Sequence, residues 1–201
     1  FVKHLLELSQ FLFLISTFQE YKVFAFSSDP KQFIEEIIDE AKIILSSGST
    51  QEIKAKKLSE IAMETVDIKG LAYYTLGKKR KEISSEELKK YEELFETYFL
   101  KSFTSRLTDY SDPKINVLSA EMVNEKYTIV QTLLLKTDKK PEVKIDWRVY
   151  TKDPNNPLIR DLIVEGLSLA RATREEFASV LNTNNNDINA LFLTLEEFIN
   201  K

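Results

Sequence analysis

The sequence predicts an α+β fold in which a four-stranded antiparallel sheet packs against a layer of helices and encloses an apolar pocket. Over about residues 29–110, apolar side chains recur every three or four positions, which is the spacing of one-sided helices. From about residue 114 they alternate at every second position, as in half-buried strands, before helical spacing returns near the end of the chain. We therefore expect one domain over residues 26–201, with a helical part followed by a sheet and C-terminal helices.

Composition limits the chemistry that this domain can perform. The chain has 201 residues, 43% hydrophobic content and a formal net charge of -4, which are values typical of a globular domain with a real core. It contains no Cys, so thiolate catalysis, Cys-ligated zinc and disulfides are excluded. Its single His is His4, which argues against a catalytic triad or a His-ligated metal in the folded body. A nucleic-acid partner would need a local basic patch.

Residues 1–25 have the pattern of a signal peptide. Lys3 and His4 precede a run rich in Leu and Phe, and Val23-Phe24-Ala25 offers the small residues that a signal peptidase reads. Glu7 and Gln10 interrupt the apolar run, so an amphipathic helix that stays attached is the alternative. An export signal would place the mature chain outside the cytoplasm.

The helical part has clear start and stop signals. Asp29 followed by Pro30 predicts the beginning of a helix, Thr50 predicts the beginning of a second, and Asp67 predicts that of a third, which Gly77 would close. Each of these helices is predicted to be apolar on one side.

A dense basic run, Lys78-Lys79-Arg80-Lys81, follows the third helix. Taken alone it could contact nucleic acid or anionic lipid. Glu82, Glu86 and Glu87 come close behind, which favours a solvated loop between helices.

The longest helix is predicted to start at the capping box Ser84-Ser85-Glu86-Glu87. Its apolar positions fall at steps of three and four and form a largely aromatic stripe over about five turns. Such a stripe is more often protein core than ligand wall, although aromatic rings between a sheet and a helix also line apolar pockets. The stripe consists of Leu88, Tyr91, Leu94, Phe95, Tyr98, Phe99, Ser102, Phe103 and Leu107.

Four strands are predicted after Asp112-Pro113, which ends the helical part. The second should be central in the sheet because both of its faces carry apolar groups. In the last, Gly166 predicts a bulge or a close backbone approach. Thr173-Arg174-Glu175-Glu176 then has the spacing of a capping box, and Asp187 predicts the start of a terminal helix. The predicted strands cover about residues 115–123, 127–135, 143–149 and 158–169.

Two groups of short motifs resemble the MlaC family, also called the toluene-tolerance family, which is the periplasmic phospholipid-binding auxiliary component of the Mla ABC transport system. The chain lacks the Trp that the family usually carries in its basic loop, and residues 182–186 form an unusual polar run. The first group is Val66-Asp67-Ile68, Leu71-Ala72, Leu76-Gly77, the basic run, and Ser85-Glu86-Glu87 leading into Tyr91, Phe95 and Phe99. The second group is Glu165-Gly166-Leu167-Ser168-Leu169 and Arg174-Glu175-Glu176-Phe177.

The resemblance implies an NTF2-like or cystatin-like fold and a non-enzymatic carrier that shuttles phospholipid between the outer and inner membranes. The implied partners are phospholipid, an inner-membrane ABC transporter and an outer-membrane lipoprotein and porin complex. No cofactor, metal or nucleic acid is expected. Arg174 is expected at the rim, near a headgroup, or else in a salt bridge to Glu165 or as a solvated side chain. The expected lipid wall consists of Ile129, Leu133, Leu135, Ile145, Trp147, Ile163 and Leu167 from the sheet and Phe95, Tyr98 and Phe99 from the long helix.

Two other classes of function stay open. An enzyme of cone-shaped α+β fold could use Asp146 or Asp161 as a general base in an apolar cavity. Strand carboxylates beside Arg148 and Arg160 are more simply interpreted as cross-strand ion pairs. A pure interaction module could use the aromatic stripe and the basic run to bind another protein.

Overall fold

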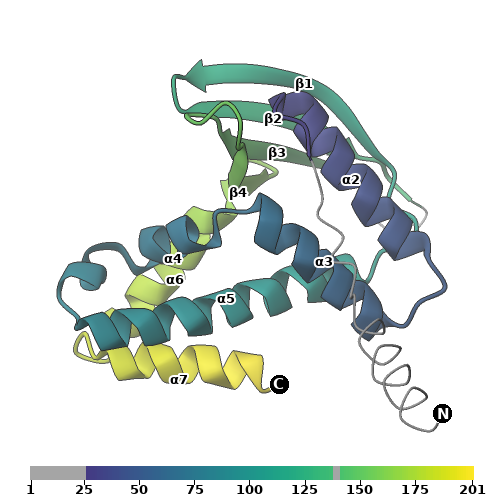
Figure 1. The fold of residues 1–201 in the computed structure, drawn as a ribbon. Coiled ribbons are helices and arrows are strands. Elements are labelled where there is room, and N and C mark those ends of the chain that lie inside the picture. Colours follow the sequence, from purple (N-terminus) through teal and green to yellow (C-terminus); the bar gives the residue numbers. More distant parts are fainter. Residues whose placement is uncertain (1–25, 138–140) are drawn as a thin grey trace, which may run out of the picture.

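A computed structural model describes residues 26–137 and 141–201, and it shows a curved sheet above a layer of helices (Figure 1). The predicted signal peptide lies outside the described residues. The sequence prediction of an α+β fold is confirmed. In chain order the elements are α2 (Pro30–Ser46), α3 (Gln51–Thr65), α4 (Ile68–Leu76), the 3-10 helix η1 (Gly77–Lys81), α5 (Ser85–Leu107), β1 (Ile115–Asn124), β2 (Tyr127–Leu134), β3 (Val143–Tyr150), β4 (Leu158–Val164), β5 (Leu167–Ser168), α6 (Leu169–Thr183) and α7 (Ile188–Ile199).

The helices of the first half begin and end where the sequence predicts. Asp29, Thr50 and Asp67 each accept a hydrogen bond from a backbone N–H in the first turn of the helix that follows. Ser84 and Glu87 form a reciprocal capping box at the start of α5. Gly77 ends α4 with a φ of 62°, a backbone conformation that glycine adopts without a steric penalty.

The sheet has five antiparallel strands in the order β1-β2-β3-β4-β5, with β2 and β3 paired on both sides. The fifth strand was not predicted. It arises because Glu165 and Gly166 both adopt positive φ, at 50° and 80°, and form a two-residue hairpin of the type that matches the strand twist. The glycine that predicted a bulge therefore turns the chain.

Helix α6 starts four residues before the predicted capping box at Thr173, so that prediction is wrong. Ser168 is the N-cap, and its hydroxyl accepts a hydrogen bond from the Arg171 N–H. The buried carboxylate of Asp161 accepts from the Ser168 hydroxyl at 2.5 Å and from the Ala170 N–H at 3.0 Å. A carboxylate on a neighbouring strand thus satisfies the first donors of the helix, and the spacing of Thr173 and Glu176 carries no information about it.

The two faces of the sheet differ in burial. Directly opposed residues of an antiparallel pair share a face, so the register assigns each strand residue to one side. We call the side toward the helices the inner face and the other side the outer face. The inner face carries Thr128, Val130, Thr132, Ile145, Trp147, Val149 and Leu162. The outer face carries Ile129, Gln131, Leu133, Lys144, Asp146, Arg148, Asp161 and Ile163.

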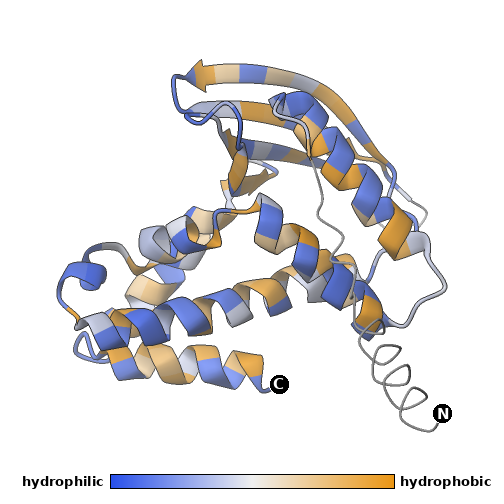
Figure 2. Cartoon of the chain, viewed as in Figure 1, coloured by the Kyte–Doolittle hydropathy of each residue, from blue (hydrophilic) through white to orange (hydrophobic). Residues whose placement is uncertain are grey.

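The core joins the inner face to the helices. Val130 and Val149 are fully buried and belong to one apolar cluster with the buried sides of α2, α3 and α5. Helix α2 lies across β1 and β2, while α4, α5, α6 and α7 form the layer below (Figure 1). Figure 2 shows apolar and polar residues alternating along the strands, whereas η1 is polar throughout. In the part of the chain that the structure describes, no helix is both long and apolar enough to cross a membrane.

Candidate functional site

The strand register divides the predicted sheet wall between two faces. Thr132 pairs with Ile145, which places Ile145 on the inner face beside Trp147. Leu133 pairs with Lys144, which places Leu133 on the outer face, and Ile129 and Ile163 lie there too. The seven predicted sheet residues therefore cannot form one wall. Alternation in the sequence separates two sets of side chains, but it does not say which set faces the helices when both contain apolar residues.

Two of the predicted wall residues lie at the ends of strands. Leu167 belongs to the short β5 and is 59% exposed. Leu135 follows β2, and its N–H donates to the Lys114 carbonyl at 2.8 Å. Neither lies among the buried residues of the inner face.

Trp147 is part of the closed core. Its side chain is buried, and its indole Nε1–H donates to the Thr132 hydroxyl at 3.0 Å. That hydroxyl donates in turn to the Ile145 carbonyl at 2.9 Å. Each polar group in this series of hydrogen bonds has a partner, so protein contacts alone fix the position of the indole ring.

The aromatic stripe of α5 begins in a closed environment. Phe95 is buried with its ring centroid 6.3 Å from that of Phe177 on α6. The Tyr98 ring lies 5.7 Å from Phe177 and 4.8 Å from Phe198 on α7, and burial raises the pKa of the Tyr98 hydroxyl, with a smaller contribution from Glu176. These two predicted wall residues therefore pack between helices.

The stripe continues into the second half of α5, which we define as residues 99–107. Phe99 stacks on Phe103, with 5.9 Å between ring centroids and 6° between ring planes, and both rings are only half-buried. Both pack against the edge of the core and not inside it. Along the stripe, therefore, the Tyr91 and Phe95 rings are buried, whereas Tyr98, Phe99 and Phe103 keep part of their ring surface exposed.

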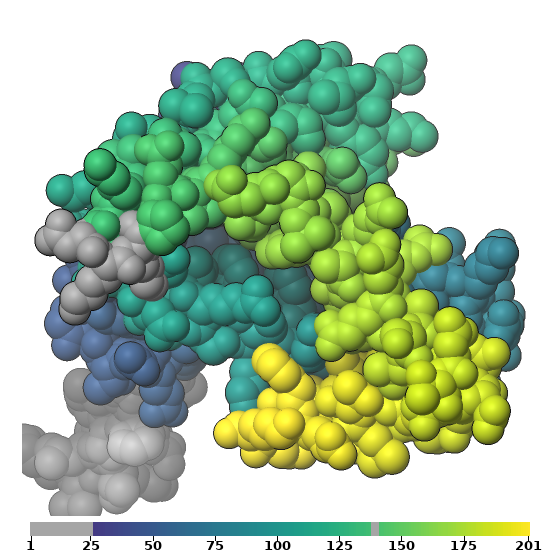
Figure 3. Space-filling model, turned by 180° about the vertical axis from the view of Figure 1, so that it is seen from behind, coloured from purple at the N-terminus to yellow at the C-terminus, as the bar shows by residue number. Residues whose placement is uncertain are grey.

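A hollow separates the second half of α5 from β3 and β4. Seen from behind, Figure 3 shows it as a recess between the green strands and the teal helix. We take as its candidate lining the half-buried apolar side chains at the edge of the core that belong to the aromatic stripe in this half of α5 or to the inner face of β3 and β4. These hollow residues are Phe99, Phe103, Leu107, Ile145 and Leu162. Phe99 and Ile145 were predicted as wall residues. The helical periodicity already included Phe103 and Leu107, whereas Leu162 could be found only from the register.

Arg174 contacts α4 and not the sheet. Its guanidinium lies 5.0 Å from the centre of the Tyr74 ring, in a cation–π contact. A side chain at Gly77 would lie only 3.3 Å from Arg174 Nη2, so the glycine leaves room for the arginine. The alternative salt bridge to Glu165 does not form among the described residues, and the Glu165 carboxylate accepts a hydrogen bond from the Lys144 N–H instead.

The two carboxylates considered as general bases belong to the outer face. Asp161 lies opposite Arg148, with 3.8 Å between Oδ2 and Nη1, which confirms the predicted cross-strand pair. Lys144 Nζ lies 3.6 Å from Asp146 Oδ2. By register, neither carboxylate points toward the hollow. Within residues 26–137 and 141–201, no group of three His, Cys, Asp or Glu side chains could hold a metal ion.

Arg160 joins the sheet to the helical layer instead of forming a cross-strand pair. Its Nε lies 2.6 Å from Asp67 Oδ2, and its guanidinium stacks 3.7 Å from the centre of the Tyr150 ring. Burial lowers the pKa of Arg160, but hydrogen bonds to Tyr127 and Asp67 outweigh burial, so that the pKa is raised overall. Asp67 therefore both caps α4 and fixes it to β4.

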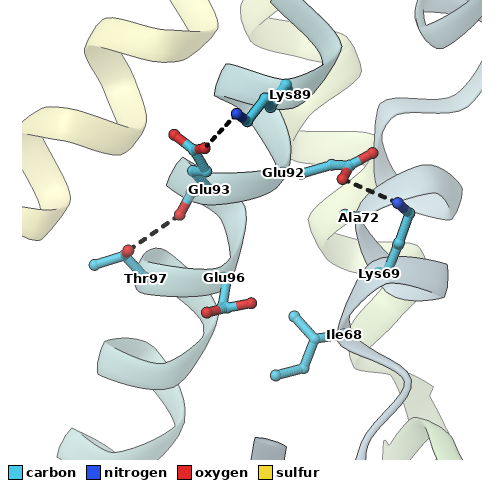
Figure 4. Close-up of a pocket in the computed structure, with 8 residues that line it drawn as sticks. All are labelled: Ile68, Lys69, Ala72, Lys89, Glu92, Glu93, Glu96 and Thr97. Carbon is cyan, nitrogen blue, oxygen red and sulfur yellow. Dashed lines mark hydrogen bonds and ion pairs between the residues drawn. The ribbon is translucent and has the colours of Figure 1, made fainter.

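A second cavity, of about 370 Å³, lies on the surface between α4 and α5 (Figure 4). Ile68 and Ala72 form its apolar part, and the remaining lining side chains are polar or charged. Glu92 Oε2 lies 3.1 Å from Lys69 Nζ across this cavity. The charged lining makes it unsuitable for acyl chains, because each charge would have to lose its contact with water. Its lining also includes Lys89, Glu93, Glu96 and Thr97.

Comparisons with known proteins agree with the fold and with the motifs. A family model described as MlaC protein matches residues 31–197. The structure resembles that of a phospholipid-binding protein from Ralstonia solanacearum in complex with a phospholipid, with a TM-score of 0.70 and 16% identity. The likeness covers 83% of this chain and 94% of that one and, at this identity, shows a shared fold. No curated protein sequence matches. Because the family model spans most of the sequence, the chain belongs to the MlaC family.

Proposed function

We propose that this protein is a phospholipid carrier that shields acyl chains in the hollow between the inner face of the sheet and the second half of α5. The observation that carries the proposal is the contrast along α5, where Phe95 is closed in by other helices while Phe99 and Phe103 keep apolar surface at the hollow. The family membership and the phospholipid bound to the Ralstonia solanacearum protein support this assignment.

Binding of this kind requires no reacting group. Burying methylenes is worth about 0.8 kcal/mol each, so one acyl chain gains on the order of 10 kcal/mol over water. A bilayer offers the chain about the same, so affinity alone sets no direction of transport. Direction must come from the proteins that deliver and receive the lipid. We propose an inner-membrane ABC transporter and an outer-membrane lipoprotein and porin complex in these roles, with the carrier moving between them in the periplasm.

The direct test is to express the chain in a lipid-containing host, purify it without detergent, and analyse a denaturing extract by mass spectrometry. We expect phospholipid in a fixed ratio to protein. A folded protein that releases none would contradict the proposal.

Adjacent residues of β4 offer a matched pair of variants. Leu162 lies on the inner face and is proposed to line the hollow, Ile163 lies on the outer face, and both are half-buried. Leu162→Trp should fill part of the hollow with protein and lower the lipid ratio, because the change removes space and not apolarity. Ile163→Trp should leave the ratio unchanged. Equal ratios in the two variants would place the lipid elsewhere.

A further inference from the structure

The basic run after α4 forms a projecting end of the molecule. Lys78, Lys79, Arg80 and Lys81 all lie in η1, which projects from one end of the helical layer (Figure 1). Lys78, Arg80 and Lys81 are exposed. The formal net charge of the whole chain is -4. The four positive charges of η1 are therefore a local feature of this end and not a property of the whole surface.

Only some of these four cations make ion pairs or hydrogen bonds within the protein. Lys79 pairs with Glu82 at 3.4 Å, and Arg80 donates to the Tyr73 carbonyl at 3.2 Å near the end of α4. Lys78 and Lys81 make no ion pair or side-chain hydrogen bond within the described part of the chain. A folding role therefore accounts for two of the four cations and leaves the other two available to a partner.

Tyrosine rings lie beside the cations. Tyr74 is 41% exposed, and the Arg174 guanidinium lies over its ring. Arg80 lies 5.9 Å from the centre of the neighbouring Tyr73 ring. Tyrosine together with Lys and Arg is the combination that proteins place at the boundary between water and a lipid bilayer.

We propose that this basic end, defined as Lys78, Lys79, Arg80 and Lys81 with Tyr73, Tyr74 and Arg174, docks the protein on the surface of an anionic bilayer. The exposed lysines lie against lipid phosphates, and the Tyr74 ring lies at headgroup level. Docking of this kind is peripheral and reversible, because a few surface cations give a weak attraction that salt screens. The proposal concerns a different surface from the hollow and does not require the hollow to hold lipid.

The test measures partition of the full chain onto sedimented vesicles of phosphatidylcholine with and without phosphatidylglycerol. Lys78→Gln/Lys81→Gln removes the two unpaired cations, and Lys56→Gln/Lys57→Gln removes two exposed cations from α3 as a matched control. Each basic residue near an anionic surface changes partition about fivefold, so the first variant should bind on the order of 25-fold more weakly and the control should bind like the unaltered protein. Raising salt from 0.1 M to 1 M shortens the screening length from about 10 Å to about 3 Å and should release the protein.

Three results would overturn the proposal. These are the absence of a preference for anionic vesicles, an equal loss in the control variant, and binding to soluble polyglutamate without binding to vesicles, which would indicate an acidic protein partner. Phospholipid extracted from each variant is measured in parallel. Unchanged extraction with lost docking separates this surface from the carrier function, whereas unaltered protein that docks on vesicles but yields no phospholipid would count against the carrier proposal alone.

Discussion

Two apolar regions of this molecule differ in how completely protein covers them. In the closed region between α5, α6 and α7, the Tyr91, Phe95 and Phe177 rings are all buried. In the hollow between α5 and the sheet, Phe99 and Phe103 are only half-buried. Both regions draw on the same aromatic stripe. The difference shows that periodicity identifies an apolar helix face, whereas the neighbours of each turn decide whether that face becomes core or a binding wall.

The largest expected effect is on stability in the closed region. Phe95→Ala should lower the free energy of unfolding by about 3–5 kcal/mol, because it removes a buried ring from a packed site. Phe99→Ala should lower it by only about 1–2 kcal/mol, since part of that ring is already exposed. Urea unfolding of lipid-free protein measures both values. Equal losses would mean that Phe99 is core as well.

A buried hydrogen bond gives a smaller effect in the same region. The hydroxyls of Tyr91 and Thr75 lie 2.8 Å apart, both side chains are buried, and burial raises the pKa of Tyr91. Tyr91→Phe keeps the ring and should cost about 1 kcal/mol, because Thr75 retains its bonds to the Leu71 and Ala72 carbonyls. Thermal or urea unfolding checks the value, and a loss as large as that of Phe95→Ala would show that the hydroxyl organises the region.

The smallest effect lies at the surface of the helical layer and depends on pH. The Tyr73 hydroxyl donates to Glu92 at 2.5 Å, and this hydrogen bond, with help from Lys69, lowers the pKa of Glu92. A carboxyl whose folded pKa is below its unfolded value stabilises the fold at neutral pH and loses that contribution as the pH falls through the folded pKa. Glu92→Gln should therefore cost about 0.5 kcal/mol at pH 7.

The control for that prediction is the same comparison in acid. At about pH 3, below the usual pKa of a glutamate, the difference in unfolding free energy between Glu92→Gln and the unaltered protein should shrink toward zero. A difference that stays constant between neutral and acid pH would show that the contact does not depend on the charge of Glu92.

Much of the fold follows from local sequence signals. The caps at Asp29, Thr50, Asp67 and Ser84 were predicted because a cap and its helix lie within four residues. The start of α6 was missed because it depends on Asp161, which lies on β4. The Asp161 carboxylate accepts a hydrogen bond from the Ala170 N–H in the first turn of α6. A contact between distant segments leaves no periodic trace in the sequence.

The candidate site shows the same limit. Ile145 was placed correctly on the inner face, but Leu133 and Ile163 were grouped with it although the register puts them on the other side. Both strand faces carry apolar residues, so hydrophobicity alone could not orient β2. The basic run was predicted to be a solvated loop, and its exposure in η1 agrees with that, while its use by a partner is a separate proposal.

The most direct test of the carrier proposal is the phospholipid-to-protein ratio in two variants of neighbouring strands. Ile145→Asn places a polar group on the inner face, and Leu133→Asn places the same group on the outer face at similar burial. Circular dichroism confirms that each is folded, and Phe103→Asn replaces Ile145→Asn if that variant does not fold. We predict a several-fold lower ratio for the inner-face variant and an unchanged ratio for Leu133→Asn. Equal ratios, or a larger loss for Leu133→Asn, would contradict the proposal.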